Sequence, residues 1–85
     1  MEEKNVGFVK HVFKKISVAV LEVSDSFEIG DHLRFTSKNE GFSQIASSME
    51  VNHQKVNIAR KGDDVAIKVD RPVKKRDLVF KVMQK

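Results

Sequence analysis

The 85-residue sequence contains no cysteine, tryptophan or tyrosine, and only one proline and four glycines. The lack of cysteine excludes disulfide bonds, thiol catalysis and thiolate metal sites. The longest purely apolar run, Val18–Leu21, is far too short to span a membrane. The polar start, Met1–Asn5, is not followed by the apolar core of a signal peptide. We therefore expect a cytoplasmic protein that makes no contact with a membrane.

Catalytic and metal-binding motifs are missing as well. The sequence has no P-loop to hold nucleotide phosphates and no serine in a nucleophile elbow, so we expect neither enzymatic activity nor a cofactor. His11, His32 and His53 recur at equal intervals, which raises the question of a repeat or a three-histidine metal site. Their neighbouring residues share little, which favours surface histidines. Asp63–Asp64 follows a glycine and is typical of a turn.

Length and charge set the broad class of the chain. A chain this short forms a single domain, which we expect over residues 5–83, with residues 1–4 and 84–85 as flexible tails. The net charge is +4, and such a surplus can neutralise nucleic-acid phosphates. Charged residues make up 33% of the chain, however, so the composition alone favours a mixed solvated surface.

Several segments combine β-branched and aromatic residues with an alternation of apolar and polar positions, which is typical of half-buried strands. They are Asn5–Phe13, Ile16–Val23, His32–Thr36, Phe42–Val51, Val65–Val69 and Leu78–Met83. Turn signals recur between them about every eight to twelve residues, the spacing of a sandwich or barrel. We predict an all-β fold, a small closed antiparallel β-barrel of about six or seven strands, because closure removes exposed edges.

One short helical turn is expected between the strands. Asn52 is a suitable N-cap for a turn over His53–Lys61, in which Val56 and Ala59 would face the core. Gly62 would then end the turn in the left-handed conformation that glycine adopts at low cost.

Other turns and the phenylalanines complete the predicted fold. Gly30–Asp31 predicts a second turn with glycine at positive φ, and residues 37–41 predict a third turn. Lys14–Lys15 is predicted to form the tip of a hairpin between the first two strands. Phe8, Phe35 and Phe80 fall on apolar faces and are expected in the core, whereas Phe13 and Phe42 lie near loop ends and are candidates for exposure.

Four patterns along the chain carry a family resemblance. They are Ile29-Gly30-Asp31-His32-Leu33, Phe42-Ser43-Gln44, Ser48-Met49-Glu50, and the set Val56, Ala59, Gly62, Val65 and Ile67. Together they resemble the second domain of translational GTPases such as elongation factor Tu and bacterial initiation factor two, and its small free-standing relatives. The resemblance runs from about Asn5 to Val82 and implies a translation-protein β-barrel. Ala66 and Arg76 stand where that family usually has glycine, and we expect Arg76 to relax its turn or change the loop geometry.

The resemblance implies a binding role in translation. Basic loops would contact RNA, tRNA or the ribosome, through Lys14 and Lys15, Arg60 and Lys61, and Lys74, Lys75 and Arg76. Glu50 matches a glutamate that lies near the terminal adenosine of tRNA in elongation factor Tu, although an exposed carboxylate at a strand end is the simpler interpretation. The alternative is a protein–protein interaction barrel that docks on a larger enzyme, as in the appended domains of U32-type peptidases.

Overall fold

The computed structural model describes residues 2–36 and 41–83, which form ten β-strands and one 3-10 turn. The elements are β1 (Glu2–Phe13), η1 (Lys14–Ile16), β2 (Val18–Val23), β3 (Phe27–Glu28), β4 (His32–Phe35), β5 (Phe42–Ile45), β6 (Met49–Val51), β7 (Gln54–Lys55), β8 (Ile58–Ala59), β9 (Asp64–Lys68) and β10 (Leu78–Met83). Within these residues there is no helix with the length and apolar character needed to cross a membrane. Most of the turn predicted over residues 37–41, and the tail predicted over residues 84–85, lie outside the described residues.

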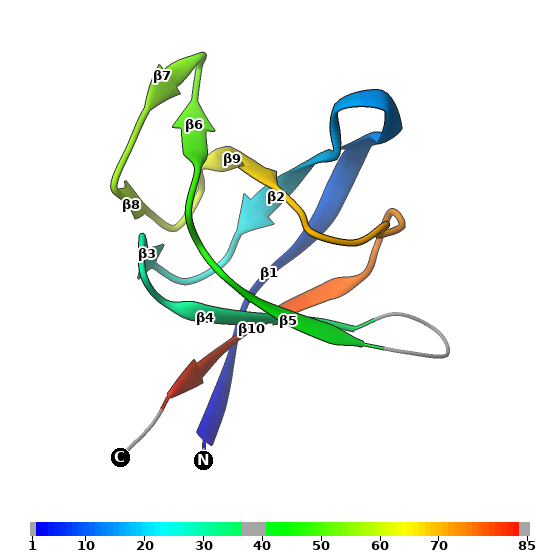
Figure 1. Ribbon diagram of the computed structural model, residues 1–85. Coiled ribbons are helices and arrows are strands. Elements are labelled where there is room, and N and C mark those ends of the chain that lie inside the picture. Colours follow the sequence, from blue (N-terminus) through cyan, green and yellow to red (C-terminus); the bar gives the residue numbers. More distant parts are fainter. Residues whose placement is uncertain (1, 37–40, 84–85) are drawn as a thin grey trace.

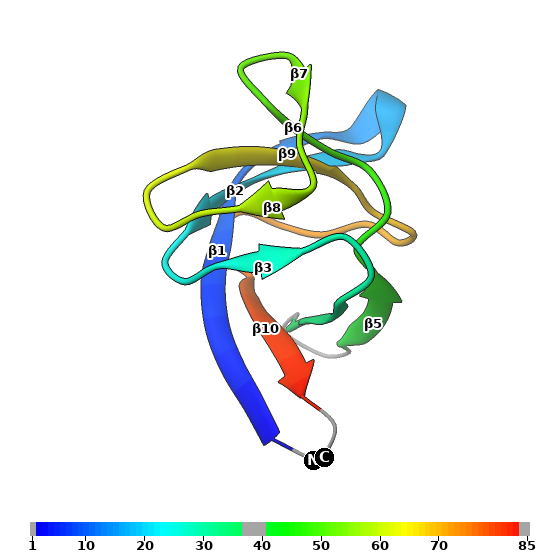
Figure 2. The ribbon, with the colours of Figure 1, turned by 90° about the vertical axis from the view of Figure 1, so that its left-hand side faces the viewer.

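Eight of the strands form one antiparallel sheet, in the order β5-β4-β10-β1-β2-β9-β6-β7. This sheet curls into a half-barrel (Figure 1), and the short β3–β8 pair lies in front of it in Figure 2. The prediction of an all-β antiparallel barrel is confirmed, with more and shorter strands than expected. Residues 2–4, expected in a flexible tail, lie in β1, where Glu2 is the register partner of Met83 in β10.

The core fills the concave side of the curled sheet, where alternate residues of each strand point inward. It is formed by Val6, Val9, Ala19, Leu21, Val23, Phe27, Leu33, Phe35, Ala46, Met49, Ala59, Val65, Ile67, Val69, Val73 and Val79. Each large side chain buried in this way stabilises the fold by about 1.5–3 kcal/mol. Phe35 lies in the core as predicted and stacks on Phe42, while Phe8 and Phe80 are only partly buried. Phe13 is exposed, as predicted.

β1 is bent by two irregularities that let it pair with β10 on one side and β2 on the other. The register shifts between Asn5 and Gly7 against β10, and between Val9 and His11 against β2. A Cβ atom at Gly7 would overlap the carbonyl oxygen of Glu22, so only glycine allows this close approach of the strands. Such bulges increase the local bend and twist of a strand, which helps the sheet to curl.

Three four-residue turns share the same backbone geometry, and each of them ends in an aspartate. In Glu28–Asp31, Arg60–Asp63 and Lys74–Asp77, the aspartate N–H donates to the first carbonyl oxygen, and its carboxylate accepts from the first N–H at 2.8–2.9 Å. The third position has positive φ in each turn: 96° in Gly30, 92° in Gly62 and 76° in Arg76. Left-handed glycines at the first two positions are as predicted. The expectation for the third is wrong, because the turn keeps its geometry and the arginine adopts positive φ.

The helical turn predicted over His53–Lys61 is wrong, because this segment is extended. Asn52 and His53 have φ of 52° and 65° and form the two-residue turn that joins β6 to β7. Positive φ at both central positions is the requirement of a type I′ hairpin turn, and asparagine and histidine tolerate it better than most residues. The spacing of Val56 and Ala59, which suggested a helix, is satisfied instead by a bend into β8.

The long strand predicted over residues 42–51 is divided into β5 and β6, which lie far apart in the order of the sheet. Gln44 connects the two regions. Its side chain is buried; its Nε2 donates to the carbonyl oxygen of Lys68 at 2.7 Å, and its Oε1 accepts from the N–H of Asp70 at 2.8 Å. One side chain therefore joins β5 to the end of β9, where the sheet order gives no backbone ladder.

Candidate functional site

The predicted basic residues fall on two different ends of the molecule. Lys14 and Lys15 form η1 at the tip of the β1–β2 hairpin, as predicted, and the Lys74–Asp77 turn lies beside that tip. The contact is made by the bulge of β1, because the Val9 N–H donates to Asp77 O and the Arg76 N–H donates to Val9 O, both at 2.8 Å. These two basic loops therefore converge.

The third basic loop does not join them. Arg60 and Lys61 precede Gly62, whose N–H donates to the carbonyl oxygen of Val23 at the far end of β2. Figure 2 shows the β8–β9 turn on the side of the molecule opposite η1. Arg60 and Lys61 are thus exposed on a separate face.

A hollow between the two converging loops is here named the basic crevice. It is lined by His11, Val12, Lys14, Val73, Lys74 and Lys75, with a cavity volume of about 340 Å³. The two valines supply an apolar floor, because Val73 belongs to the core and Val12 packs against it. Three lysines surround this floor, so the crevice is a positively charged depression.

A second hollow lies on the other side of η1 and is here named the tip groove. Its cavity volume is about 440 Å³, and it is lined by Phe13, Ile16, Val18, Ser48, Glu50, His53, Ala66 and Lys68. Neighbouring strands β2, β9 and β6 provide its floor, and η1 and the β6–β7 turn rise on its two sides. Glu50 lies here, opposite Ala66 on β9 and Lys55 on β7. The arrangement brings Glu50 close to the η1 tip rather than to Arg60 and Lys61.

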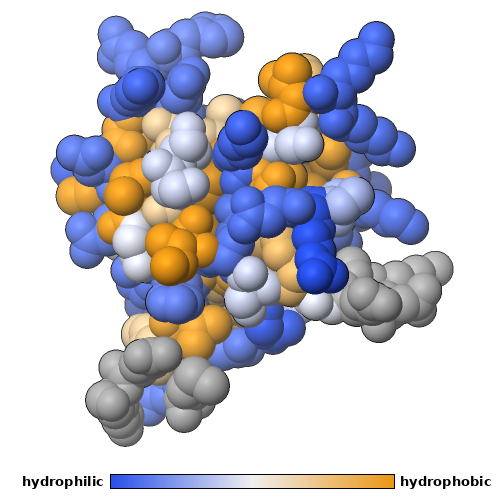
Figure 3. All heavy atoms as spheres, in the orientation of Figure 1, coloured by the Kyte–Doolittle hydropathy of each residue, from blue (hydrophilic) through white to orange (hydrophobic). Residues whose placement is uncertain are grey.

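The two most informative side chains of the tip groove, Ile16 and Phe13, were not among the predicted site residues. Ile16 is 63% exposed and Phe13 is 46% exposed, although both are large and apolar. Figure 3 shows apolar atoms at this corner of the molecule, with hydrophilic side chains projecting on either side. The available signal was an isoleucine directly after two lysines in a hairpin tip, where a polar residue is usual.

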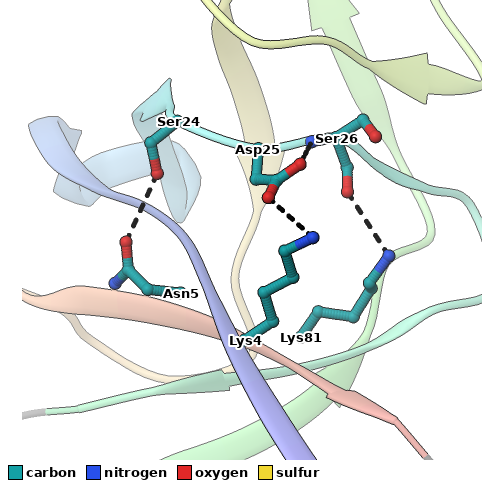
Figure 4. Close-up of polar contacts among 6 residues, drawn as sticks. All are labelled: Lys4, Asn5, Ser24, Asp25, Ser26 and Lys81. Atoms are coloured by element: carbon teal, nitrogen blue, oxygen red, sulfur yellow. Dashed lines mark hydrogen bonds and ion pairs between the residues drawn. The ribbon is translucent and has the colours of Figure 1, made fainter.

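Ion pairs among the described residues lie away from this face. They join Lys4 to Asp25 at 2.8 Å, Lys10 to Asp64 at 3.1 Å and to Glu22 at 3.9 Å, and Arg34 to Glu3 at 2.6 Å. Figure 4 shows the first pair beside hydrogen bonds from Lys81 to the Ser26 carbonyl and from Ser24 to Asn5, which fix the β2–β3 loop to the terminal strands. The hydrogen bond from Arg34 lowers the pKa of Glu3, and that from Lys4 lowers the pKa of Asp25.

Lysines of the site face are different. Within residues 2–36 and 41–83, none of Lys14, Lys15, Lys68, Lys74 and Lys75 has a carboxylate or another hydrogen-bond partner for its ammonium group. Positive charge that the described residues do not neutralise therefore lies on this face, and Arg60 and Lys61 carry further such charge on the opposite face.

The three histidines and the Asp63–Asp64 pair do not come together in one site. His11 lines the basic crevice, His53 lines the tip groove, and His32 lies on β4. The described part of the chain contains no group of three histidine, cysteine, aspartate or glutamate side chains that could hold a metal ion. Asp63 caps its turn, while Asp64 pairs with Lys10.

The comparisons with known proteins point to one kind of domain. No protein-family profile matches the chain. An uncharacterized protease of Methanocaldococcus jannaschii is 36% identical over 76 residues, which is 88% of this chain but only 19% of that protein. Two crystal structures of the C-terminal domain of a U32 peptidase from Geobacillus thermoleovorans share the fold. The first has a TM-score of 0.81 at 20% identity, and the alignment covers 89% of this chain and 96% of that domain. The second has a TM-score of 0.83 at 21% identity, and the alignment covers 92% of this chain and 91% of that domain.

These similarities correct the expected relationship. The resemblance to the second domain of translational GTPases is wrong, because the structures that share the fold are domains of a peptidase and none of these findings leads to a translation factor. The glycine–aspartate patterns that carried the resemblance arise from a turn that this fold uses repeatedly, so they indicate local geometry rather than ancestry. The expected contacts with RNA, tRNA and the ribosome were implied by this resemblance and are no longer supported.

Proposed function

We propose that this chain is a non-catalytic domain that binds a protein, and that its partner is the catalytic part of a U32-type peptidase. The observation that carries the proposal is the match to part of a protease. The chain spans about a fifth of the length of that relative, and its fold is that of a separate C-terminal domain. A domain of this kind acts by association, and the chemistry resides in the remainder of the larger protein.

The tip groove supports a binding role over a catalytic one. Ser48, Glu50 and His53, the residue types of a hydrolytic triad, all line it. Within the described residues no hydrogen bond joins any two of them, so the serine has no base to activate it. Exposed apolar side chains with a polar rim are instead a feature of a protein-binding surface.

Association is tested by isolating complexes of the affinity-tagged chain from the cells that produce it, after nuclease treatment. We expect a U32-type peptidase, identified by mass spectrometry, to co-purify, and the two purified proteins to form a complex in analytical ultracentrifugation. Failure of the purified proteins to associate would refute the proposed partner.

Catalysis is tested separately with fluorescently labelled casein. The isolated chain should release no more fluorescence than its Ser48→Ala variant. Cleavage by the wild-type chain that is lost in the variant would show that the groove is an active site and would refute the binding role.

A further inference from the structure

We infer that the tip groove binds an extended, acidic protein segment that inserts a large apolar side chain between η1 and the β6–β7 turn. This inference rests on the proposed protein-binding function and adds the chemistry of the bound segment. The observations that carry it are the apolar side chains that line the groove, the unpaired positive charge beside it and the fixed conformation of its two walls.

The apolar side chains that line the groove call for an apolar ligand group. Phe13, Ile16 and Val18 place aliphatic and aromatic surface in one hollow, and Ile16 has the largest exposed fraction of the exposed large apolar side chains. Covering such surface gains about 25 cal/mol per Å². The cavity volume of about 440 Å³ suits one or two inserted side chains and is too small to receive a folded domain.

The charges around the floor call for carboxylates on the ligand. Lys14, Lys15 and Lys68 lie on or beside the groove and have no acidic partner among the described residues. Among the lining residues Glu50 balances Lys68, so the positive balance at the edge of the groove comes from Lys14 and Lys15 on η1. Acidic residues on both sides of the inserted side chain would complement this charge and accelerate association.

Both walls of the groove are held in place before a ligand arrives. Ser17 ends η1 with φ of 55°; its N–H donates to the Lys14 carbonyl at 3.4 Å, and its carbonyl accepts from the Val69 N–H at 2.9 Å. The opposite wall is the tight turn at Asn52 and His53. A preformed groove avoids the entropic cost of ordering loops on binding, so even a short segment can bind.

The binding test uses NMR, because an 85-residue chain gives a resolved amide spectrum. The probe is the peptide Glu-Glu-Phe-Leu-Glu-Glu, with the peptides Lys-Lys-Phe-Leu-Lys-Lys and Glu-Glu-Ser-Ser-Glu-Glu as controls. We expect the acidic apolar peptide to shift amides of residues 13–18, 48–53 and 66–68, and both controls to shift them far less. Equal shifts with the basic peptide, or shifts confined to other residues, would overturn the inference.

Two variants with matched controls extend the test to the whole partner. Ile16→Ser should weaken binding about tenfold, because one apolar contact is lost, whereas Ile58→Ser removes an exposed isoleucine from β8 and should have no effect. Charge reversal at Lys14 and Lys15 should weaken binding most at low salt, whereas Lys61→Glu on the opposite face should not. All five side chains are exposed, so the variants should fold like the wild type.

The outcomes separate this inference from the proposed function. If the wild-type chain binds the peptidase and Ile16→Ser binds it equally well, the docking surface lies elsewhere and only the inference fails. If the acidic peptide binds in the groove but no peptidase associates, the inference holds and the proposed partner is wrong. Binding of single-stranded RNA in competition with the acidic peptide would count against both.

Discussion

Replacing Arg76 with glycine should stabilise the protein, because this residue occupies a left-handed position that two sister turns give to glycine. Its φ of 76° compares with 96° in Gly30 and 92° in Gly62. A side chain in this region costs about 1–2 kcal/mol. Glycine removes this cost, but it also adds conformational freedom to the unfolded chain, which offsets about 0.4–1 kcal/mol of the stabilisation. The net gain is about 0.5–1 kcal/mol, which corresponds to a rise in Tm of about 2–8 °C for a domain of this size.

Thermal unfolding followed by circular dichroism measures this change, and Arg76→Ala is the decisive control. Both variants remove a positive charge next to Lys74 and Lys75, but only glycine removes the Cβ atom. We expect a clearly higher Tm for the glycine variant than for the alanine variant. Equal values would show that charge repulsion, not backbone strain, is relieved. A lower Tm for the glycine variant would refute the left-handed conformation of Arg76.

Three further changes test other parts of the fold. Gly62→Ala should lower the free energy of unfolding by about 1 kcal/mol in urea titrations. Nothing lies within 4 Å of the added Cβ atom, so the loss must come from the positive φ at residue 62 and not from a steric clash. Gln44→Ala should cost about 1–3 kcal/mol by the same assay, since it removes two part-buried hydrogen bonds. Hydrogen bonding to Arg34 lowers the pKa of Glu3 in the folded state, so its stabilising effect is complete above the ordinary value of 4.5 and is lost as the pH falls below it. Glu3→Gln should flatten this acid-side loss, and an unchanged slope would show that the pair is not maintained in solution.

The parts of the fold that could be predicted are those with one buried face. His32–Thr36 and Val65–Val69 alternate between apolar and polar residues because they cover the core on one side only, and β4 and β9 are found there. Strands β7 and β8 contain two residues each, which is too short for any alternation to show. Val56 and Ala59 then matched a helical spacing by coincidence, and the left-handed pair Asn52 and His53 produced a hairpin instead.

The candidate site could be predicted only in its charges. The pairs Lys14–Lys15 and Lys74–Lys75 both stand out in the sequence. The two pairs lie close together because the bulge at Val9 forms hydrogen bonds with the Lys74–Asp77 turn. Sequence separation gives no indication of that contact. The apolar half of the site was missed because Ile16 is typical of a core residue, and only its position at a hairpin tip leaves it exposed. Phe13 is predicted to be exposed, but the sequence alone gives no reason to place it in a binding site.

The two hydrogen bonds of Gln44 mark a place where β5 can separate from the end of β9 without global unfolding. Elsewhere adjacent strands are joined by several backbone hydrogen bonds, whereas β5 and the end of β9 are joined through the two ends of one amide side chain. Local openings follow the weakest connections of a structure and occur at lower free energy than global unfolding. The amide proton of Asp70 should therefore exchange with solvent faster than the amides of β1 and β2. Its exchange rate would report how often β5 separates from the end of β9.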